Sequence, residues 1–156
     1  MKHSDHIIIK TPIGYLKIIE ENNHIIRIEH TCETPLKDSS KKVLKEIKEA
    51  INQYFEYREL PTNLPLQLTG TPFQIKVYQA LQEIPYGTTY TYQEIANKIG
   101  HPKANRAVGN ACSKNPLLLV VPCHRVIRKN GDIGGFSALI QIKMQLLNHE
   151  QATRII

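Results

Sequence analysis

A change of hydrophobic periodicity constrains the fold of this 156-residue sequence more than any other feature. Three isoleucine-rich stretches with the composition of strands come first, and from residue 71 the apolar residues recur at the spacing of helices. We expect the strands at residues 7–10, 15–20 and 24–29, separated by turn-forming residues. The sequence therefore predicts two unlike parts, one based on hairpin strands and the other mainly helical.

The first part should form a small α/β domain. Ser39 or Ser40 can cap a helix whose apolar face, beginning at Val43, continues at helical spacing to Phe55. The proline-containing stretch 61–65 is expected to link this domain to the next. We place the domains at residues 1–66 and 67–156, and we expect the first to have a packing role.

The second part should contain a helix-turn-helix. Thr71 suits an N-cap and Pro72 suits the first helical position. Two further helices are expected at about residues 92–99 and 103–113, joined by a short turn that contains glycine. The second of these helices carries small residues that allow close approach to DNA or to a packed neighbour. Its polar residues are Lys103, Asn105, Arg106, Asn110 and Lys114.

A thiol beside an imidazole is the strongest candidate for chemistry. The apolar run 117–121 has the length and composition of a short buried strand, and Cys123 and His124 follow it. A thiol is nucleophilic as its thiolate, and a basic or cationic neighbour lowers its pKa. Because successive residues of a strand point to opposite faces, His124 would reach Cys123 only if the chain bends, or through a water. A buried thiol next to a surface histidine is the alternative.

Charge is distributed unevenly along the chain. The formal net charge is +6, and residues 1–70 contain ten basic and ten acidic residues. Residues 71–156 contain ten basic residues and four acidic ones, so all the excess lies in the half that holds Cys123. This imbalance indicates a polyanionic partner, most simply nucleic acid, with an ordinary basic protein as the alternative.

Neither an export signal nor a membrane partner is expected. The first apolar run is three isoleucines, too short for the core of a signal peptide, and no stretch approaches the length of a membrane span. The cysteines, Cys32, Cys112 and Cys123, have no paired spacing. We therefore expect free thiols and a cytoplasmic location.

Seven short segments of the second part occur in the order found in one protein family. They are Thr71-Pro72-Phe73-Gln74, Ile84-Pro85-Tyr86-Gly87, Tyr92-Gln93-Glu94-Ile95-Ala96, Arg106-Ala107-Val108-Gly109, Asn115-Pro116, Pro122-Cys123-His124-Arg125-Val126 and Leu147-Asn148-His149-Glu150. In these segments the chain resembles the methylated-DNA–protein-cysteine methyltransferases, the O6-alkylguanine-DNA alkyltransferases. The resemblance implies a ribonuclease-H-like α/β N-terminal domain. It also implies a mainly α, winged-helix-like C-terminal domain that holds the helix-turn-helix and the reactive cysteine.

The resemblance also implies a reaction. The alkyl group of O6-methylguanine, and also of O4-methylthymine, would pass irreversibly from double-stranded DNA to Cys123 after the nucleotide is flipped out. His124 would act as the base through a water, and Glu150 would orient and charge-stabilise His124. Tyr92 would assist rotation of the DNA backbone and donate to the flipped base, and Asn115 would brace the turn that carries the cysteine. No cofactor is implied.

For binding to DNA, the resemblance implies that Arg106 fills the gap left in the base stack. The protein is expected to act as a monomer. The other implied DNA contacts are Tyr92, Lys103, Asn105, Asn110 and Arg125. The implied alkyl pocket consists of Val126, Phe136 and Ser137. Taken singly, Arg106 could equally be a solvated or phosphate-contacting residue, Tyr92 a core aromatic and Glu150 a surface carboxylate.

Two features differ from family members. Residues 136–140 read Phe-Ser-Ala-Leu-Ile where many members have Tyr-Ser-Gly-Gly-Leu. This loop should therefore be less permissive; a methyl group should fit, and the size limit stays open. Some relatives hold zinc, but the spacing of His24, His30 and Cys32 does not match, so no metal site is expected.

Three other functions make different predictions. A lesion-binding relative without chemistry would replace the nucleophile, whereas Cys123 is present. A helix-turn-helix regulator would show a footprint at one operator, and it leaves the Cys-His pair and Glu150 unexplained. A cysteine hydrolase would turn over ester or peptide substrates. The alkyltransferase accounts for more of these residues than the others do, and we prefer it.

Overall fold

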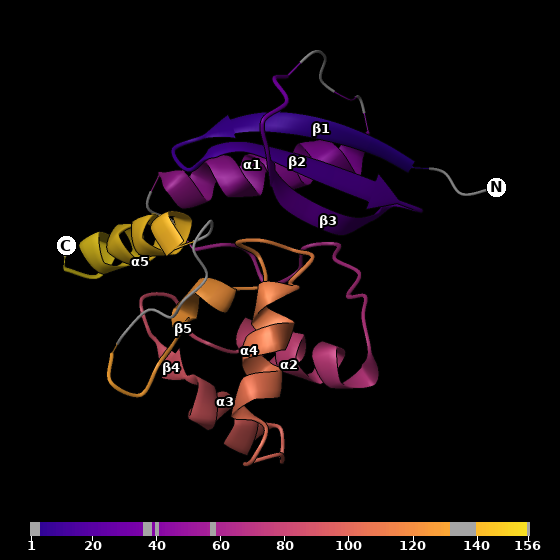
Figure 1. The fold of residues 1–156 in the computed structure, drawn as a ribbon. Helices are drawn as coiled ribbons and strands as arrows, with labels where there is room; N and C mark the ends of the chain where they lie inside the picture. Colours follow the sequence, from indigo (N-terminus) through magenta and orange to yellow (C-terminus); the bar gives the residue numbers. More distant parts are fainter. Residues whose placement is uncertain (1–3, 36–38, 40, 57–58, 132–139, 156) are drawn as a thin grey trace. The chain divides into compact units, whose positions relative to one another are not determined.

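The computed structural model describes residues 4–35, 39, 41–56, 59–131 and 140–155 (Figure 1). The chain forms two compact units. The first consists of residues 1–69 with 116–118, and the second of residues 70–115 with 119–156.

The first unit contains an antiparallel sheet in the order β1-β2-β3, with helix α1 packed against it (Figure 1). Its elements are β1 (Ser4–Thr11), β2 (Gly14–Glu21), β3 (His24–Thr31) and α1 (Lys42–Phe55). The three predicted strands are confirmed, each somewhat longer than expected. Asn22 and Asn23 have φ of 52° and 64°, as a tight turn between twisted strands requires.

Alternate residues of the sheet form the core of this unit. Leu16 and Ile18 of β2 are fully buried, as are Leu44 and Ile47 of α1, the helix that packs against this sheet. The helix starts differently from the expectation. Its N-cap is Lys41, without a side-chain cap, because the Ser39 hydroxyl donates to Asp5 and accepts from the Lys41 amide instead. The alternative cap, Ser40, lies outside the described residues.

The predicted strand at residues 117–121 is wrong. Its beginning makes one bridge with β3: the Ile28 amide donates to the Pro116 carbonyl, and the Leu118 amide donates to the Ile28 carbonyl. A turn follows, in which Leu119 takes a φ of 76°. The run is apolar because the turn itself is buried, and a short apolar run reports burial without specifying a strand.

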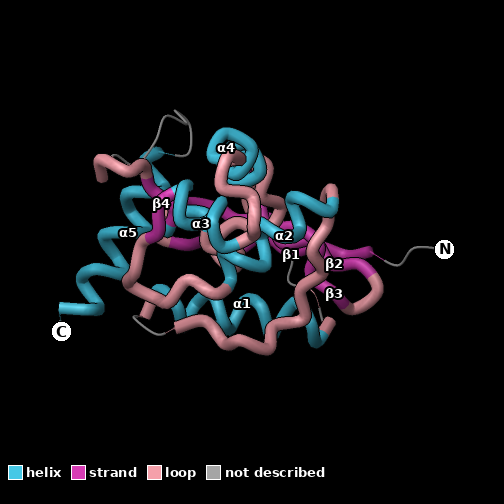
Figure 2. The backbone as a smooth tube through the Cα atoms, turned by 90° about the horizontal axis from the view of Figure 1, so that it is seen from below, coloured by secondary structure: helices cyan, strands magenta, loops and turns pink. Residues whose placement is uncertain are grey.

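The second unit is mainly helical (Figure 2). Its elements are α2 (Pro72–Gln82), β4 (Tyr90–Thr91), α3 (Tyr92–Lys98), α4 (Asn105–Ser113), the 3-10 turn η1 (Cys123–Arg125), β5 (Val126–Ile127) and α5 (Ile140–Ile155). Thr71 and Thr91 form capping boxes with Gln74 and Glu94, which fixes the starts of α2 and α3. Gly100, with a φ of 80°, follows the end of α3. The predicted helix-turn-helix is therefore confirmed as α3 and α4, which pack on each other.

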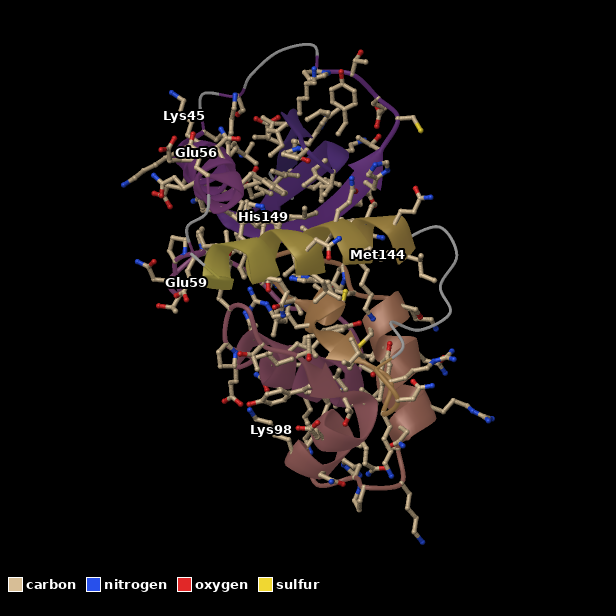
Figure 3. All side chains as sticks on the ribbon, turned by 90° about the vertical axis from the view of Figure 1, so that its left-hand side faces the viewer. Lys45, Glu56, Glu59, Lys98, Met144 and His149 are labelled. Atoms are coloured by element: carbon tan, nitrogen blue, oxygen red, sulfur yellow. The ribbon has the colours of Figure 1, made fainter. Side chains whose placement is uncertain are left out.

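The last helix, α5, buries Ile142 and Leu146 and leaves Met144 46% exposed (Figure 3). Within the described residues, no helix combines the length and apolar character needed to cross a membrane.

Candidate active site

A short parallel pairing places Cys123 near the helix-turn-helix. Tyr90 of β4 pairs with Val126 of β5, and Thr91 pairs with Ile127. The turn η1 precedes this ladder on β5 and α3 follows it on β4, so they lie at opposite ends of a ladder that is only two residues long. Cys123 is a half-buried free thiol in η1. The 3-10 turn replaces the strand geometry that would have directed Cys123 and His124 to opposite faces. Asn115 donates to the Val121 carbonyl over 2.7 Å, which ties down the turn before the cysteine.

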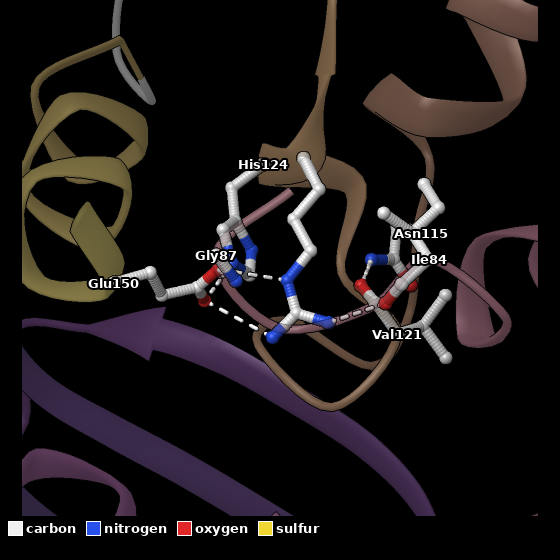
Figure 4. Close-up of polar contacts among 7 residues, drawn as sticks. Ile84, Gly87, Asn115, Val121, His124 and Glu150 are labelled. Carbon is white, nitrogen blue, oxygen red and sulfur yellow. Dashed lines mark hydrogen bonds and ion pairs between the residues drawn. The ribbon is translucent and has the colours of Figure 1, made fainter. Parts of the chain in front are cut away.

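The residues that follow Cys123 in the chain, His124 and Arg125, form a buried charged cluster with Glu150 (Figure 4). His124 Nε2 and Glu150 Oε2 are 2.6 Å apart. Arg125 donates from Nε to Oε1 of Glu150 over 2.8 Å, and from Nη2 to Oε2 over 3.1 Å. Its Nη1 donates to the Ile84 carbonyl over 2.8 Å. Glu150 and His124 are 1% and 2% exposed, so bulk water does not screen these contacts.

The charges of this cluster determine the tautomer of His124. Burial alone would raise the pKa of Glu150, but the hydrogen bonds and charges of His124 and Arg125 hold the pKa below its ordinary value. An ionised carboxylate only accepts hydrogen bonds, so His124 Nε2 carries the proton. Burial holds the pKa of His124 below its ordinary value against the opposing effect of Glu150. His124 is therefore neutral, and its buried Nδ1, which makes no hydrogen bond within the described residues, is a proton acceptor.

Two groups favour the thiolate of Cys123. Burial raises the pKa of Cys123, whereas the hydrogen bond with Asn115 and the positive charge of Lys143 lower it. The sequence interpretation missed Lys143. Its Nζ donates to the Val126 carbonyl over 2.5 Å and lies 5.7 Å from the centre of the Tyr92 ring. The signal that could have identified it is its position seven residues before Glu150, on the same face of a helix.

The helix-turn-helix borders a groove of about 780 Å³, which we call the α3–α4 groove. Four predicted DNA-contacting residues line it: Tyr92, Asn105, Arg106 and Asn110. Arg128 and Lys129, which the sequence interpretation missed, also line it. Burial raises the pKa of Tyr92 to about 12, so its phenol stays protonated at neutral pH and can donate a hydrogen bond.

The remaining predicted residues are placed differently. Lys103 is exposed just before α4 and does not line the groove. Arg125, expected to contact DNA, is only 8% exposed with its guanidinium bonded to Glu150 and Ile84, so that expectation is wrong. Val126 is fully buried beside the cysteine turn, while Phe136 and Ser137 lie outside the described residues. Among the described residues, no group of three or more histidine, cysteine or acidic side chains could hold a metal ion.

Family comparisons agree with this fold and site. The ribonuclease-like domain of 6-O-methylguanine DNA methyltransferase matches residues 6–68, and the DNA binding domain of the same family matches residues 72–152. The chain belongs to the 6-O-methylguanine DNA methyltransferase family. This confirms the resemblance recognised in the sequence and the fold class that it implied.

Individual relatives match over almost the whole chain. A probable methylated-DNA–protein-cysteine methyltransferase of Acanthamoeba polyphaga mimivirus is 44% identical over 149 residues, which are 92% of this chain and 95% of the relative. The constitutive methylated-DNA–protein-cysteine methyltransferase of Bacillus subtilis is 42% identical, covering 91% of this chain and 92% of its own. The crystal structure of Mycobacterium tuberculosis O6-methylguanine methyltransferase superimposes with a TM-score of 0.87 at 33% identity, covering 97% of this chain and 94% of that chain. A structure of the same organism's OGT in complex with DNA gives 0.83 at 34% identity, covering 95% and 93%.

Proposed function

We propose that this protein is a DNA-repair methyltransferase that moves the alkyl group of O6-methylguanine in double-stranded DNA to its own Cys123, once per molecule. O4-methylthymine is the second substrate that we expect. The observation that carries the proposal is the half-buried free thiol followed in the chain by a neutral, Glu150-bonded His124. The relatives named as methylated-DNA–protein-cysteine methyltransferases support it.

The chemistry follows from the protonation states. The thiol proton of Cys123 passes through a water to Nδ1 of His124, and Glu150 stabilises the resulting imidazolium. The thiolate then attacks the alkyl carbon: the S–C bond forms while the C–O6 bond breaks, and its electron pair stays on guanine. A hydrogen bond from the Tyr92 phenol stabilises the departing base, which takes a proton from solvent and leaves as neutral guanine. Asn115 holds the cysteine turn in place throughout.

Access to the alkyl carbon requires that the nucleotide leave the base stack. The exposed Arg106 on α4 is suited to fill the gap, because it borders the same groove as Tyr92. Asn105 and Asn110 line this groove and would contact the DNA backbone, with Arg128 and Lys129 adding positive charge. Lys103 would approach DNA from the start of α4. We propose that the protein does this as a monomer in the cytoplasm, with Val126, Phe136 and Ser137 around the alkyl group.

A single-turnover stoichiometry experiment tests the proposal. The full chain is mixed with increasing amounts of a duplex containing one O6-methylguanine, and repaired guanine and intact protein mass are both measured. Product should plateau at about one alkyl group per protein, with a mass gain of about 14 Da on the Cys123 peptide, because a thioether has no proton to lose and is a poor leaving group.

The variant Cys123→Ala provides the control. It should lose transfer completely and still bind the duplex almost as tightly, since the basic groove supplies affinity and the thiol supplies chemistry. Continued turnover with an unmodified Cys123 would contradict the proposal, and so would transfer by the Ala variant.

A further inference from the structure

We propose that Arg125 is a positioning residue for alkyl transfer: by neutralising Glu150 it keeps His124 uncharged, with the proton on Nε2 and the lone pair of Nδ1 available to Cys123. The inference rests on the proposed function, in which His124 accepts the thiol proton. In this role Arg125 acts through Glu150 and His124, without contact with the substrate.

The contacts of Arg125 fix it as a rigid partner of Glu150. Both carboxylate oxygens accept from its guanidinium, at 2.8 and 3.1 Å, and the remaining terminal nitrogen donates to the Ile84 carbonyl at 2.8 Å. The guanidinium also lies 5.6 Å from the centre of the Tyr86 ring. Such a planar, bidentate pairing orients the carboxylate as well as neutralising it. Glu150 therefore presents Oε2 to His124 in one defined geometry (Figure 4).

The need for this cation follows from the burial of Glu150. Apart from Arg125 and His124, Glu150 accepts a long hydrogen bond of 3.4 Å from the Gly87 amide, which is a neutral donor. A carboxylate that is 1% exposed and has no cation beside it stays ionised only at a large desolvation penalty. Without Arg125, the pair would take up a proton, either on the carboxylate or on the imidazole. An imidazolium paired with Glu150 carries a proton on Nδ1 and cannot accept one from Cys123. With Arg125 in place the carboxylate is already balanced, and His124 stays a base.

The other groups around His124 do not replace Arg125. On α5, Lys143 also disfavours the imidazolium by its charge, but its Nζ donates to the Val126 carbonyl. On α2, the titratable side chain near the cysteine turn is Tyr78, whose hydroxyl donates to the Ala111 carbonyl. Glu150 itself favours the imidazolium, so the protonation of His124 depends on the balance between Glu150 and Arg125.

The test is a histidine-ring nitrogen NMR titration of the full chain, comparing wild type with Arg125→Gln. His124 is assigned from a His124→Gln variant. In the wild type the ring should be neutral and protonated at Nε2 at pH 7. Loss of a cation at this distance should raise the protonation midpoint by about one pH unit or more. The low-pH limb of the pH profile of the single-turnover transfer rate should move to higher pH by the same amount. At a fixed pH on that limb, the transfer rate should therefore fall about tenfold.

Two further variants separate charge from misfolding. The double variant Arg125→Gln/Glu150→Gln removes both charges, and its His124 midpoint should return to the wild-type value or below. Arg27→Gln removes an exposed arginine of β3, 53% exposed, and should change neither the midpoint nor the rate. If Arg125→Gln does not fold, Arg125→Lys carries the test. A lysine cannot reproduce the bidentate contact, so the midpoint should rise in the same direction by a smaller amount.

The role of Arg125 is overturned if the protonation midpoint of His124 keeps its wild-type value in a folded Arg125→Gln protein. The same holds for Arg125→Lys where that variant is used in its place. A rise of equal size in the single and double variants would also overturn it, because repacking rather than charge would then be the cause. The NMR measurement needs no alkylated DNA. Failure of transfer by the wild type contradicts the proposed function, whereas an unchanged midpoint with intact wild-type transfer contradicts only the role of Arg125.

Discussion

At the scale of single residues, the same Glu150 that orients His124 links the stability of the protein to pH. Its pKa in the folded state is depressed, because the hydrogen bonds and charges of His124 and Arg125 outweigh the effect of burial. A group with a depressed folded pKa contributes stability above its unfolded pKa, about 4.3 for glutamate. That contribution is lost only as the pH falls from this value through the folded pKa.

We therefore predict that Glu150→Gln lowers the free energy of unfolding by about 3–5 kcal/mol at pH 7, because it leaves the buried Arg125 charge without a partner. The difference from wild type should narrow only below about pH 4. Urea unfolding at pH 7, 4 and 3 measures both effects. Glu83→Gln is the matched control: Glu83 is 63% exposed in its ion pair with Lys98, and its loss should change stability by at most about 1 kcal/mol. A constant gap between wild type and Glu150→Gln down to pH 3 would contradict the prediction.

The residue types in the sequence predicted which side chains carry the chemistry of the site better than they predicted the burial and the partners of those side chains. The Cys123-His124 pair was recognisable because a thiol and a base are adjacent in the chain. Arg125 was misplaced because a charged side chain predicts exposure, and its partner Glu150 lies 25 residues later on another element. The role of Glu150 came from the family resemblance alone. Lys143 was missed because its surroundings are created by folding.

At the scale of elements, the sequence predicted helix bounds well where the residues that fix them act on the neighbouring backbone. The N-caps Thr71 and Thr91 and the glycine after α3 act within a few residues, so the helix bounds were close to those expected. The segment 117–121 failed because its structure depends on a distant strand: residues 116–118 pair with Ile28 of β3, and the chain then turns. Sequence periodicity contains no information on such a pairing.

The helix α4 carries a residue where stability and function should oppose each other. A Cβ on Gly109 would lie 3.8 Å from the Tyr92 ring, an ordinary contact, and Gly109 also lines the α3–α4 groove. We predict that Gly109→Ala stabilises the protein by about 0.5–1 kcal/mol through helix propensity, yet weakens binding to the lesion duplex by occupying the groove.

Thermal unfolding and duplex titration by fluorescence anisotropy measure these two effects separately. Gln79→Ala, on an exposed position of α2, is the control and should leave duplex affinity unchanged. Unchanged affinity in Gly109→Ala would show that this face of α4 does not lie against DNA.

At the scale of the whole molecule, the two units differ in charge as well as in fold. Residues 1–70 are neutral by formal charge, and the entire excess of +6 lies in the unit with the helix-turn-helix. The sequence predicted this asymmetry directly, since charge counts need no structure. It could not predict that Arg106, Arg128 and Lys129 gather on one groove, because they lie in separate segments that only the fold brings together.

Localised charge makes a quantitative prediction about salt. Each phosphate neutralised on duplex DNA contributes about −0.9 to the slope of log K against log salt concentration. If Arg128 and Lys129 each contact a phosphate, the double variant Arg128→Gln/Lys129→Gln should reduce the magnitude of this slope by about two. In the free double variant, Cys123 should still react with iodoacetamide at the wild-type rate. The slope is measured with an unmodified duplex, by fluorescence anisotropy between roughly 50 and 200 mM salt. The double variant Lys42→Gln/Lys45→Gln, on exposed positions of α1, changes the net charge equally and should leave the slope as in wild type. Equal changes in both variants would mean that affinity follows net charge rather than the groove.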